Sequence, residues 1–212
     1  MTELWSQRAA AYRDSDAHRE GPDLDAIAEW AFGAETALDV ATGGGPVARR
    51  LRENGTQVVT CDAAPGMAPD VVCAAESLPF ADASFDVVTC RVAAHHFADP
   101  AAAVKEMARV ARFKVLIADT MFMGESVEKA EKLRDPSHVR NYTESEWRGF
   151  CEGAGLSVGE VRITSRPMAK QAWLDRTGCT GETGARALAY LGDRVVGDGI
   201  VFDRISIKGL RP

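Results

Sequence analysis

The fold of this chain is decided by a stretch in which an apolar strand, a glycine-rich turn and a helix start follow one another: Leu38-Asp39-Val40-Ala41-Thr42-Gly43-Gly44-Gly45-Pro46-Val47-Ala48. The glycines let the backbone turn sharply and approach a ligand closely. Proline is favoured at the first position of a helix, so Pro46 predicts where the helix begins. Because the free N–H groups of a helix start attract negative charge, the stretch predicts an anion-binding turn, with a ligand-free turn as the alternative.

Short apolar runs alternate with helical patterns on both sides of this stretch, which is typical of β-α-β units in a parallel sheet. Further helices are expected after Asp99-Pro100 and after the capping box of Thr143 and Glu146. The last two strands alternate apolar and polar residues, as in an antiparallel edge pair. We therefore expect an α/β fold with a doubly wound, Rossmann-like, mostly parallel seven-stranded sheet and an antiparallel C-terminal edge hairpin. The expected strands are 37–41, 57–61, 70–73, 85–91, 114–119, 158–164 and 201–208.

The composition of the 212-residue chain is that of a globular protein, with 46% hydrophobic and 26% charged residues. The net charge of −6 and the pI near 5.3 argue against nucleic acid or an anionic membrane as the main partner. Five scattered cysteines without a C-x-x-C pattern predict free thiols in a reducing compartment and no metal site. Neither a signal peptide nor an apolar run of about 20 residues is visible, so we expect a cytoplasmic protein without a membrane span.

Three acids fall at the carboxyl ends of the first three expected strands, where doubly wound sheets bind their ligands. Asp39 can meet a cationic amine, Asp62 can accept hydrogen bonds from two ribose hydroxyls, and Glu76 can lie beside an adenine. Each acid alone is more often a solvated loop residue. Together, in this order, they indicate an adenosyl ligand that ends in a free amino acid.

A nicotinamide dinucleotide is the competing ligand, because Gly43-x-Gly45-x-x-Ala48 satisfies the dinucleotide fingerprint and Asp62 follows at a suitable distance. Asp39 argues against this NAD-dependent oxidoreductase. It stands where that pattern carries an apolar residue, and nicotinamide dinucleotides offer no amine to it.

With these motifs the chain resembles a class I S-adenosylmethionine-dependent methyltransferase, in the group that includes the ubiquinone and menaquinone biosynthesis methyltransferases. The resemblance covers residues 35–165 and rests on the stretch 38–48, on Asp62, on Ala75-Glu76-Ser77, on 84–97 and on 134–140. Ala41 stands in place of the first glycine of the family's first motif. A second departure is the connection 109–114, which lacks the Leu-Lys-Pro-Gly-Gly turn that the family usually has there.

The resemblance implies S-adenosyl-L-methionine as cofactor, with Asp39, Gly43 and Gly45 at its methionine end, Asp62 at the ribose and Glu76 on the adenine side. The other positions that it assigns to the cofactor site are Tyr12, Ala41, Ala63, Met67, Ala75, Ser77 and Arg91.

His95 and His96 are the candidate catalytic residues, because imidazole titrates near neutrality and the pair directly follows the fourth expected strand. The alternative for either histidine is a structural hydrogen bond. Tyr12, His18 and His138 are further candidates for the acceptor pocket, whose walls are expected from the apolar sections 121–134 and 168–174. If those sections line a pocket rather than a core, they predict an apolar or aromatic small molecule as acceptor.

A single domain, 1–212, is expected, with a helical lid at 1–30 and acceptor-site insertions at 120–142 and 166–198. The expected function is in-line methyl transfer to a small molecule. A non-catalytic adenosyl-binding protein on the same fold remains the alternative, because fold analogy alone does not establish catalysis. No feature of the sequence indicates an oligomeric state.

Overall fold

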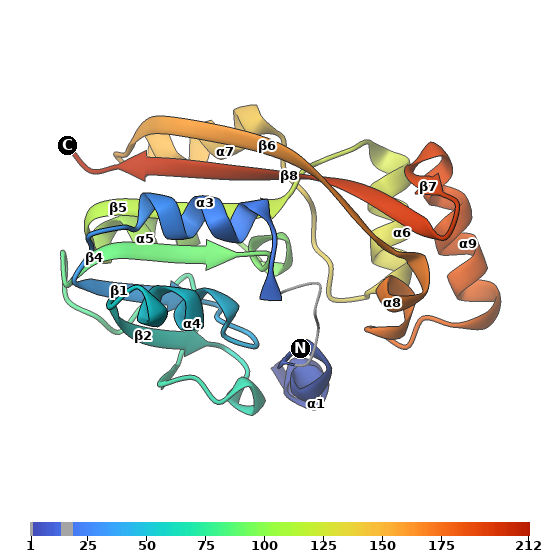
Figure 1. Cartoon of the computed structure of the whole chain (residues 1–212), viewed down its shortest axis with the longest axis horizontal. Helices are drawn as coiled ribbons and strands as arrows, with labels where there is room; N and C mark the ends of the chain where they lie inside the picture. The colour runs from blue at the N-terminus through green and yellow to red at the C-terminus, as the bar shows by residue number, and fades with distance from the viewer. Residues whose placement is uncertain (1, 14–18) are drawn as a thin grey trace.

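The computed structural model describes residues 2–13 and 19–212, with the side chains of residues 3–9 in the first range. Its sheet runs in the order β3-β2-β1-β4-β5-β8-β6, and the two-residue β7 pairs with β8 beside this path (Figure 1). The strands are β1 (Thr36–Val40), β2 (Gln57–Asp62), β3 (Val71–Val72), β4 (Phe85–Arg91), β5 (Ala111–Thr120), β6 (Ser157–Ala169), β7 (Val195–Val196) and β8 (Gly199–Leu210).

Strands β1 to β5 are parallel, and β8 lies antiparallel between β5 and the edge strand β6. This confirms the mostly parallel sheet with a C-terminal hairpin. The short β7 is an addition that was not predicted from the sequence. Strands β6 and β8 also run past the end of β5, so their far halves leave the main sheet (Figure 1).

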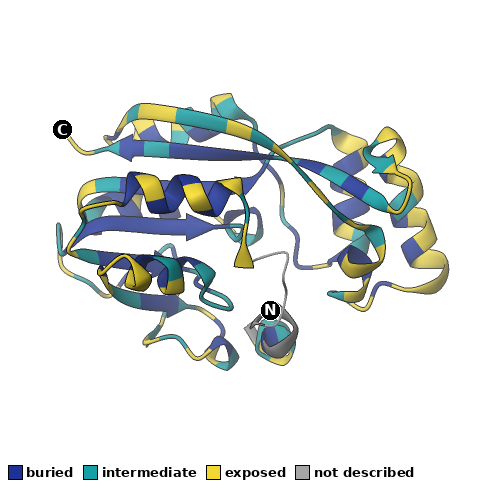
Figure 2. Cartoon of the chain, in the orientation of Figure 1, coloured by how far each residue is buried: buried dark blue, intermediate teal, exposed yellow. Residues whose placement is uncertain are grey.

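Helices cover both faces of the sheet. On one face, α3 (Pro22–Trp30) and α4 (Pro46–Glu53) bury side chains such as Ile27 and Leu51 against the strands. On the other, α5 (Pro100–Val110) and α7 (Glu144–Gly153) bury Met107 and Trp147. Figure 2 shows the central strands buried between these layers. Each large apolar side chain buried in this way contributes roughly 1.5–3 kcal/mol to stability.

The predicted helix starts are present. The Asp99 side chain accepts a hydrogen bond from the Ala102 N–H at 3.0 Å, and Thr143 and Glu146 form the reciprocal capping box. The connection that lacks the family's turn has no loop at all, since α5 ends at Val110 and β5 begins at the next residue. The pairing of β4 with β5 is irregular at this point. Phe85 pairs with Ala111 and Val87 with Lys114, so β5 has one residue more than β4 over this step, as in a β-bulge.

The far halves of β6 and β8 carry a small helical unit, which we call the cap: α6 (Glu125–Arg134), α8 (Lys170–Asp175), α9 (Gly181–Leu191) and β7 (Figure 1). Its own core includes Ala130, Trp173, Ala187 and Phe202. The segments expected as acceptor-site insertions contribute to this unit.

The N-terminal helix α1 (Thr2–Arg13) packs against the short helix η1 (Pro65–Met67). The Gly66 N–H donates to Ser6 Oγ at 3.1 Å, and a Cβ on Gly66 would lie 2.5 Å from the Ser6 backbone. Helix α3, which also falls within the expected lid, packs on the sheet. His18 and the Tyr12 side chain lie outside the described residues. No described helix is long and apolar enough to cross a membrane.

Candidate functional site

A cavity of about 320 Å³ opens at the carboxyl edge of the parallel strands, between the sheet, α1 and the cap. The loops after β1, β2 and β3, together with the last residue of β2 and the first residue of α4, contribute Ala41, Thr42, Gly43, Gly44, Pro46, Asp62, Ala63, Met67, Cys73, Ala74, Ala75 and Glu76. The end of β4 and the loop after it contribute Arg91, Val92, Ala93, His95, His96, Phe97 and Ala98. Trp5 and Thr120 also line the cavity. The remaining residues form what we call the cap-side wall: Glu131, Arg134, Met168, Trp173, Arg176, Phe202 and Arg204.

The loop that follows β1 has a left-handed backbone at three positions, Ala41 (φ 52°), Gly43 (φ 53°) and Gly45 (φ 74°). Glycine adopts this conformation without a steric cost, whereas an L-residue such as alanine pays roughly 1–2 kcal/mol. Val92, which follows β4, is also left-handed (φ 54°). Strained backbone of this kind concentrates at functional sites. Gly45 caps α4 and does not line the cavity.

Asp39 lies behind this loop, almost completely buried, and does not line the cavity. Its carboxylate accepts hydrogen bonds from Thr42 Oγ1 at 2.6 Å and from Thr89 Oγ1 at 2.9 Å. Burial raises the pKa of Asp39 to about 6 against the opposing effect of these hydrogen bonds. Thr42 itself lines the cavity, so Asp39 positions a residue of the cavity wall through this hydrogen bond.

Asp62 joins the end of β2 to the glycine loop. Its Oδ2 accepts from the Gly43 N–H at 3.0 Å and its Oδ1 from the Ala64 N–H at 2.9 Å, while burial raises its pKa. Glu76 is half-buried on the cavity wall beside the buried Ala75, whereas Ser77 is exposed and does not line the cavity.

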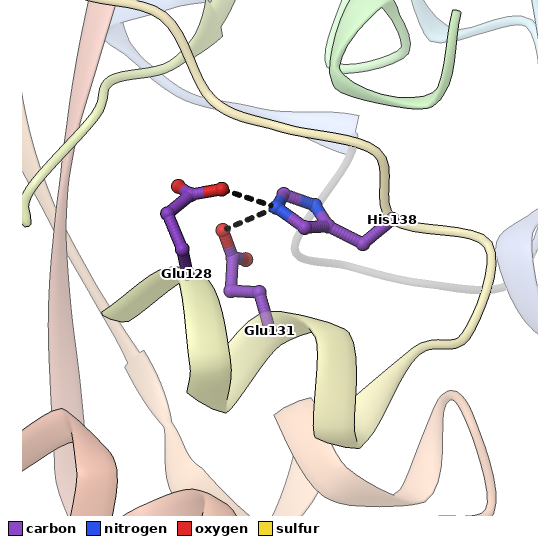
Figure 3. Close-up of side chains that lie close together, drawn as sticks. All are labelled: Glu128, Glu131 and His138. Carbon is purple, nitrogen blue, oxygen red and sulfur yellow. Dashed lines mark hydrogen bonds and ion pairs between the residues drawn. The ribbon is translucent and has the colours of Figure 1, made fainter. Parts of the chain in front are cut away.

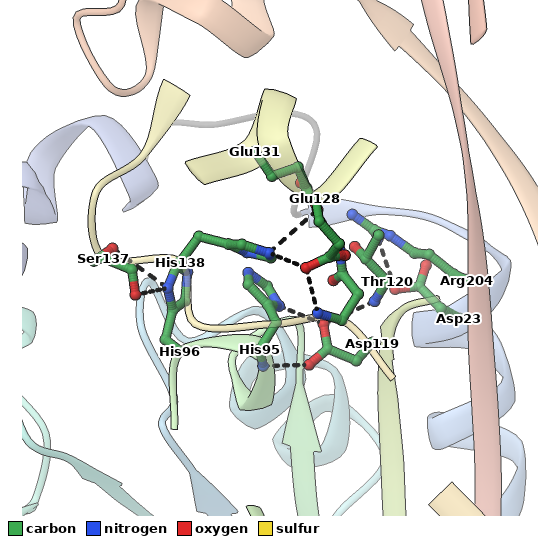
Figure 4. Close-up of polar contacts among 11 residues, drawn as sticks. Asp23, His95, His96, Asp119, Thr120, Glu128, Glu131, Ser137, His138 and Arg204 are labelled. Atoms are coloured by element: carbon green, nitrogen blue, oxygen red, sulfur yellow. Dashed lines mark hydrogen bonds and ion pairs between the residues drawn. The ribbon is translucent and has the colours of Figure 1, made fainter. Parts of the chain in front are cut away.

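His95 forms a buried pair with Asp119, at the end of β5 (Figure 4). The His95 Nδ1 lies 2.6 Å from Asp119 Oδ1, and the His95 backbone N–H donates to Oδ2 at 2.9 Å. Burial by itself would lower the pKa of His95, but the charge and hydrogen bond of Asp119 outweigh it and raise that pKa. Burial would likewise raise the pKa of Asp119, and His95 lowers it. The pair therefore favours imidazolium beside carboxylate.

The pKa of His96 is shifted in the opposite direction to that of His95. Its Nδ1 lies 3.0 Å from the carbonyl oxygen of Ser137, which can only accept, so Nδ1 carries the proton and Nε2 keeps its lone pair. Burial, together with the charge of His95, lowers the pKa of His96 to about 3. The ring centroids of His95 and His96 are 4.1 Å apart. The environment thus shifts the pKa values of these two adjacent histidines in opposite directions, upward for His95 and downward for His96.

A buried cluster that was not predicted from the sequence lies behind His95: Glu128 and Glu131 of α6 with His138 (Figure 3). The His138 Nε2 lies 3.0 Å from a Glu128 oxygen and 4.0 Å from one of Glu131. These are residue types and spacings that could hold a divalent cation. The Asn141 amide also donates to both carboxylates, so the polar groups of the cluster largely satisfy one another. Only Glu131 reaches the cavity.

Arg91 and Arg204 meet the buried Asp23 of α3 at the cavity wall. The Arg91 Nε and Arg204 Nη1 lie 2.7 and 2.8 Å from the same Asp23 oxygen. Burial would raise the pKa of Asp23, but the charges of Arg204 and Arg91 lower it to about 2. Of these residues only Arg91 was predicted from the sequence. Arg204 stands on an alternating strand, where an arginine is more often a solvated residue.

The structure therefore gathers most of the predicted site residues around one cavity. The lining residues Ala41, Gly43, Asp62, Ala63, Met67, Ala75, Glu76, Arg91, His95 and His96 were all predicted. His138 lies behind His95 and not on the wall, with ring centroids 5.5 Å apart. The expected walls at 121–134 and 168–174 contribute Glu131, Arg134, Met168 and Trp173.

Comparisons with known proteins agree with this arrangement. A family described as "Methyltransferase domain" matches residues 38–117. The uncharacterized methyltransferase YcgJ of Bacillus subtilis is 31% identical, over 88% of this chain and 83% of its own length. A demethylmenaquinone methyltransferase of Beutenbergia cavernae is 37% identical over a shorter part, 42% of this chain and 40% of its own.

Solved structures show the same likeness. A protein of Bacillus halodurans described as a methyltransferase has a TM-score of 0.79 at 30% identity, covering 91% of this chain and 100% of that one. The structure of YcgJ has a TM-score of 0.80 at 28% identity, covering 89% and 97%. With its sheet order, its glycine loop and these relatives, the chain belongs to the class I S-adenosylmethionine-dependent methyltransferase family.

Proposed function

We propose that this protein transfers the methyl group of S-adenosylmethionine to a small-molecule acceptor by in-line displacement. The observation that supports this most strongly is that residues suited to a cofactor and residues suited to an acceptor line two sides of the same cavity. One side has the glycine loop with Asp62 and Glu76, and the other has His95, His96 and the cap-side wall. At about 320 Å³ the cavity falls within the range of small-molecule sites.

The residues on the sheet side fit the cofactor. Each Asp62 oxygen accepts one backbone N–H and keeps a further lone pair, as two ribose hydroxyls require. A Cβ built on Gly43 would meet no atom within 4 Å, so this glycine leaves open space beside the cavity. Glu76 stands on the same wall for the adenine side. When bound, S-adenosylmethionine supplies a methyl group already activated by its positively charged sulfur.

The protein's contribution is to position the acceptor, to exclude water and to move a proton. Trp5, Phe97 and Trp173 give the cavity apolar surface that displaces water. His96, neutral with its lone pair on Nε2, accepts a hydrogen bond from the O–H or N–H of the acceptor. Once His95 has lost its own proton, its Nε2 takes the proton that the acceptor releases, and Asp119 stabilises the resulting imidazolium.

The first test is calorimetric titration of the purified protein with S-adenosylhomocysteine. We expect micromolar binding, a loss of at least tenfold in the Asp62→Ala variant, and no binding of NADH. The matched control is Glu152→Ala, which removes an exposed acid of α7. Folded protein that fails to bind S-adenosylhomocysteine would contradict the proposal, and NADH binding would favour an oxidoreductase. An assay that follows radiolabelled methyl groups from S-adenosylmethionine into an acceptor panel then tests turnover.

A further inference from the structure

Arg134, the last residue of α6, is a buried cation on the cavity wall with few partners. Only 10% of its side chain is exposed, and its guanidinium stacks over the Trp173 ring with the carbon 4.7 Å from the ring centroid. No hydrogen bond from this guanidinium to another described residue is found, and its Nε is buried without an acceptor. Its one ion pair among the described residues, to an Asp135 oxygen, is long at 3.7 Å.

Asp135 is already committed to other donors. Arg8 donates to both of its oxygens, at 3.1 and 3.2 Å, and Ser137 donates both its N–H and its hydroxyl. Burial would raise the pKa of Asp135, but these donors and the nearby charges lower it to about 2. Arg134 therefore lies beside a carboxylate whose oxygens already accept hydrogen bonds from Arg8 and Ser137.

Such an arrangement is costly unless something else binds the arginine. A buried charge without hydrogen-bond partners destabilises a protein, and arginine has five N–H donors to satisfy. Arg109, at the opposite edge of the sheet, shows the usual solution: it donates to Glu106, to Asp82 and to two backbone carbonyls. Stacking on Trp173 leaves the edge of the Arg134 guanidinium for an oxyanion, which that planar fork fits well.

The rest of the cap-side wall also carries more positive than negative side chains. Arg204 is 3% exposed, shares the carboxylate of Asp23 with Arg91, and also has a buried Nε without an acceptor. Among the described residues of this wall Glu131 is the one acid, and it is bound by Asn141. The wall is thus cationic in a chain whose net charge is −6. Met168, Trp173 and Phe202 give it apolar surface as well.

We infer that the methyl acceptor carries an oxyanion, a carboxylate or a phosphate, that binds the guanidinium of Arg134, while its apolar part packs against Trp173, Met168 and Phe202. Arg204 adds positive charge on the same wall. The inference rests on the proposed function for the identity of the ligand as the acceptor, whereas anion binding by this wall can be measured without turnover.

The test is calorimetric titration of protein saturated with S-adenosylhomocysteine, using phenyl phosphate, benzoate and the neutral benzamide as probes. We expect phenyl phosphate or benzoate to bind at least tenfold more tightly than benzamide, and the stronger of the two identifies the oxyanion. Arg134→Gln is expected to abolish this preference and Arg134→Lys to keep part of it. Arg186→Gln, which removes an exposed arginine of α9, is the matched control and should change nothing. Thermal unfolding establishes that each variant is folded.

Two results would overturn the inference. In the first, folded wild-type protein shows no preference for the anionic probes over benzamide. In the second, the anionic probe binds the protein alone but not the protein saturated with S-adenosylhomocysteine, and Arg134→Gln weakens the binding of S-adenosylhomocysteine, which would assign Arg134 to the carboxylate of the cofactor. If S-adenosylhomocysteine does not bind at all, the proposed function fails. The probes titrated into the protein alone then still decide whether this wall binds anions.

Discussion

His95 and Asp119 are joined twice, by the ring Nδ1 at 2.6 Å from one carboxylate oxygen and by the backbone N–H at 2.9 Å from the other. The carboxylate therefore fixes both the position of the loop after β4 and the orientation of the imidazole. Nε2 is the ring nitrogen that Asp119 does not contact, as the proposed role of His95 as a base oriented by a third group requires.

Replacing His95 by Gln should lower the rate of methyl transfer by roughly 10²–10⁴-fold, the usual contribution of a general base. The affinity for S-adenosylhomocysteine should change by less than about threefold, because His95 lies on the other side of the cavity from the glycine loop, Asp62 and Glu76, which are proposed to bind it. Because Asp119 raises the pKa of His95, the wild-type rate should rise with pH through a midpoint above the ordinary value near 6.5. A flat pH profile, or full activity in His95→Gln, would assign the histidine a structural role.

The same pair should stabilise the fold in a defined pH window. The raised pKa of His95 gives a contribution that is complete below about pH 6.5 and is lost as the pH rises through the folded value. The lowered pKa of Asp119 gives one that is present above about pH 4 and is lost as the pH falls through its folded value. Urea unfolding of Asp119→Asn should therefore show its largest deficit between about pH 4 and 6.5. A deficit that does not vary with pH would contradict this.

Asp39 should give a pH dependence opposite to that of Asp119, because its pKa is raised and not lowered. Its folded pKa of about 6 lies above the ordinary 3.8, so the folded state binds the proton more tightly than the unfolded state. Its contribution to the free energy of unfolding should therefore fall by about 2 kcal/mol as the pH rises from 4 to 7. Asp39→Asn should remove that slope, as measured by urea unfolding across this range. Asp70→Asn is the control, because the Thr60 hydrogen bonds lower the pKa of Asp70 and give a slope of opposite sign.

The left-handed Ala41 should tolerate glycine. At φ 52° the substitution Ala41→Gly removes roughly 1–2 kcal/mol of steric cost and adds roughly 0.5–1 kcal/mol of chain entropy. A net gain of about 0.5–1 kcal/mol in the free energy of unfolding is expected. Ala37→Gly, in the extended and buried part of β1, is the matched control and should destabilise the protein. Equal effects at both positions would show that strain at Ala41 is negligible.

Docking of α1 should depend on Gly66. In Gly66→Ala the new Cβ would lie 2.5 Å from the Ser6 backbone, so α1 must move away from η1. Limited proteolysis should then cut the N-terminal segment faster, with little change in the global melting temperature. Gly149→Ala, at a helical position of α7 with no atom within 4 Å, is the control and should leave the cleavage rate unchanged. Unaltered cleavage in Gly66→Ala would mean that α1 does not depend on this contact.

The framework and the sheet side of the cavity, with the glycine loop, Asp62 and Glu76, follow from local signals in the amino-acid sequence. Strand and helix periodicity, Pro46, the Asp99 cap and the Thr143 capping box each act within a few residues, so the order of the elements could be predicted. Parallel strands end at one edge of a sheet, so the sequence order of Asp62 and Glu76 was enough to predict that they lie near one another.

The cap side, by contrast, depends on tertiary packing. Arg134 and Trp173, or Glu128 and His138, come from different segments whose contact depends on how α6, α8 and the connecting chain pack. Packing also buries Asp39 behind Thr42 and shifts the pKa values of His95 and His96 in opposite directions. Burial and charge environment are sums over distant parts of the chain, and a local sequence pattern does not contain them.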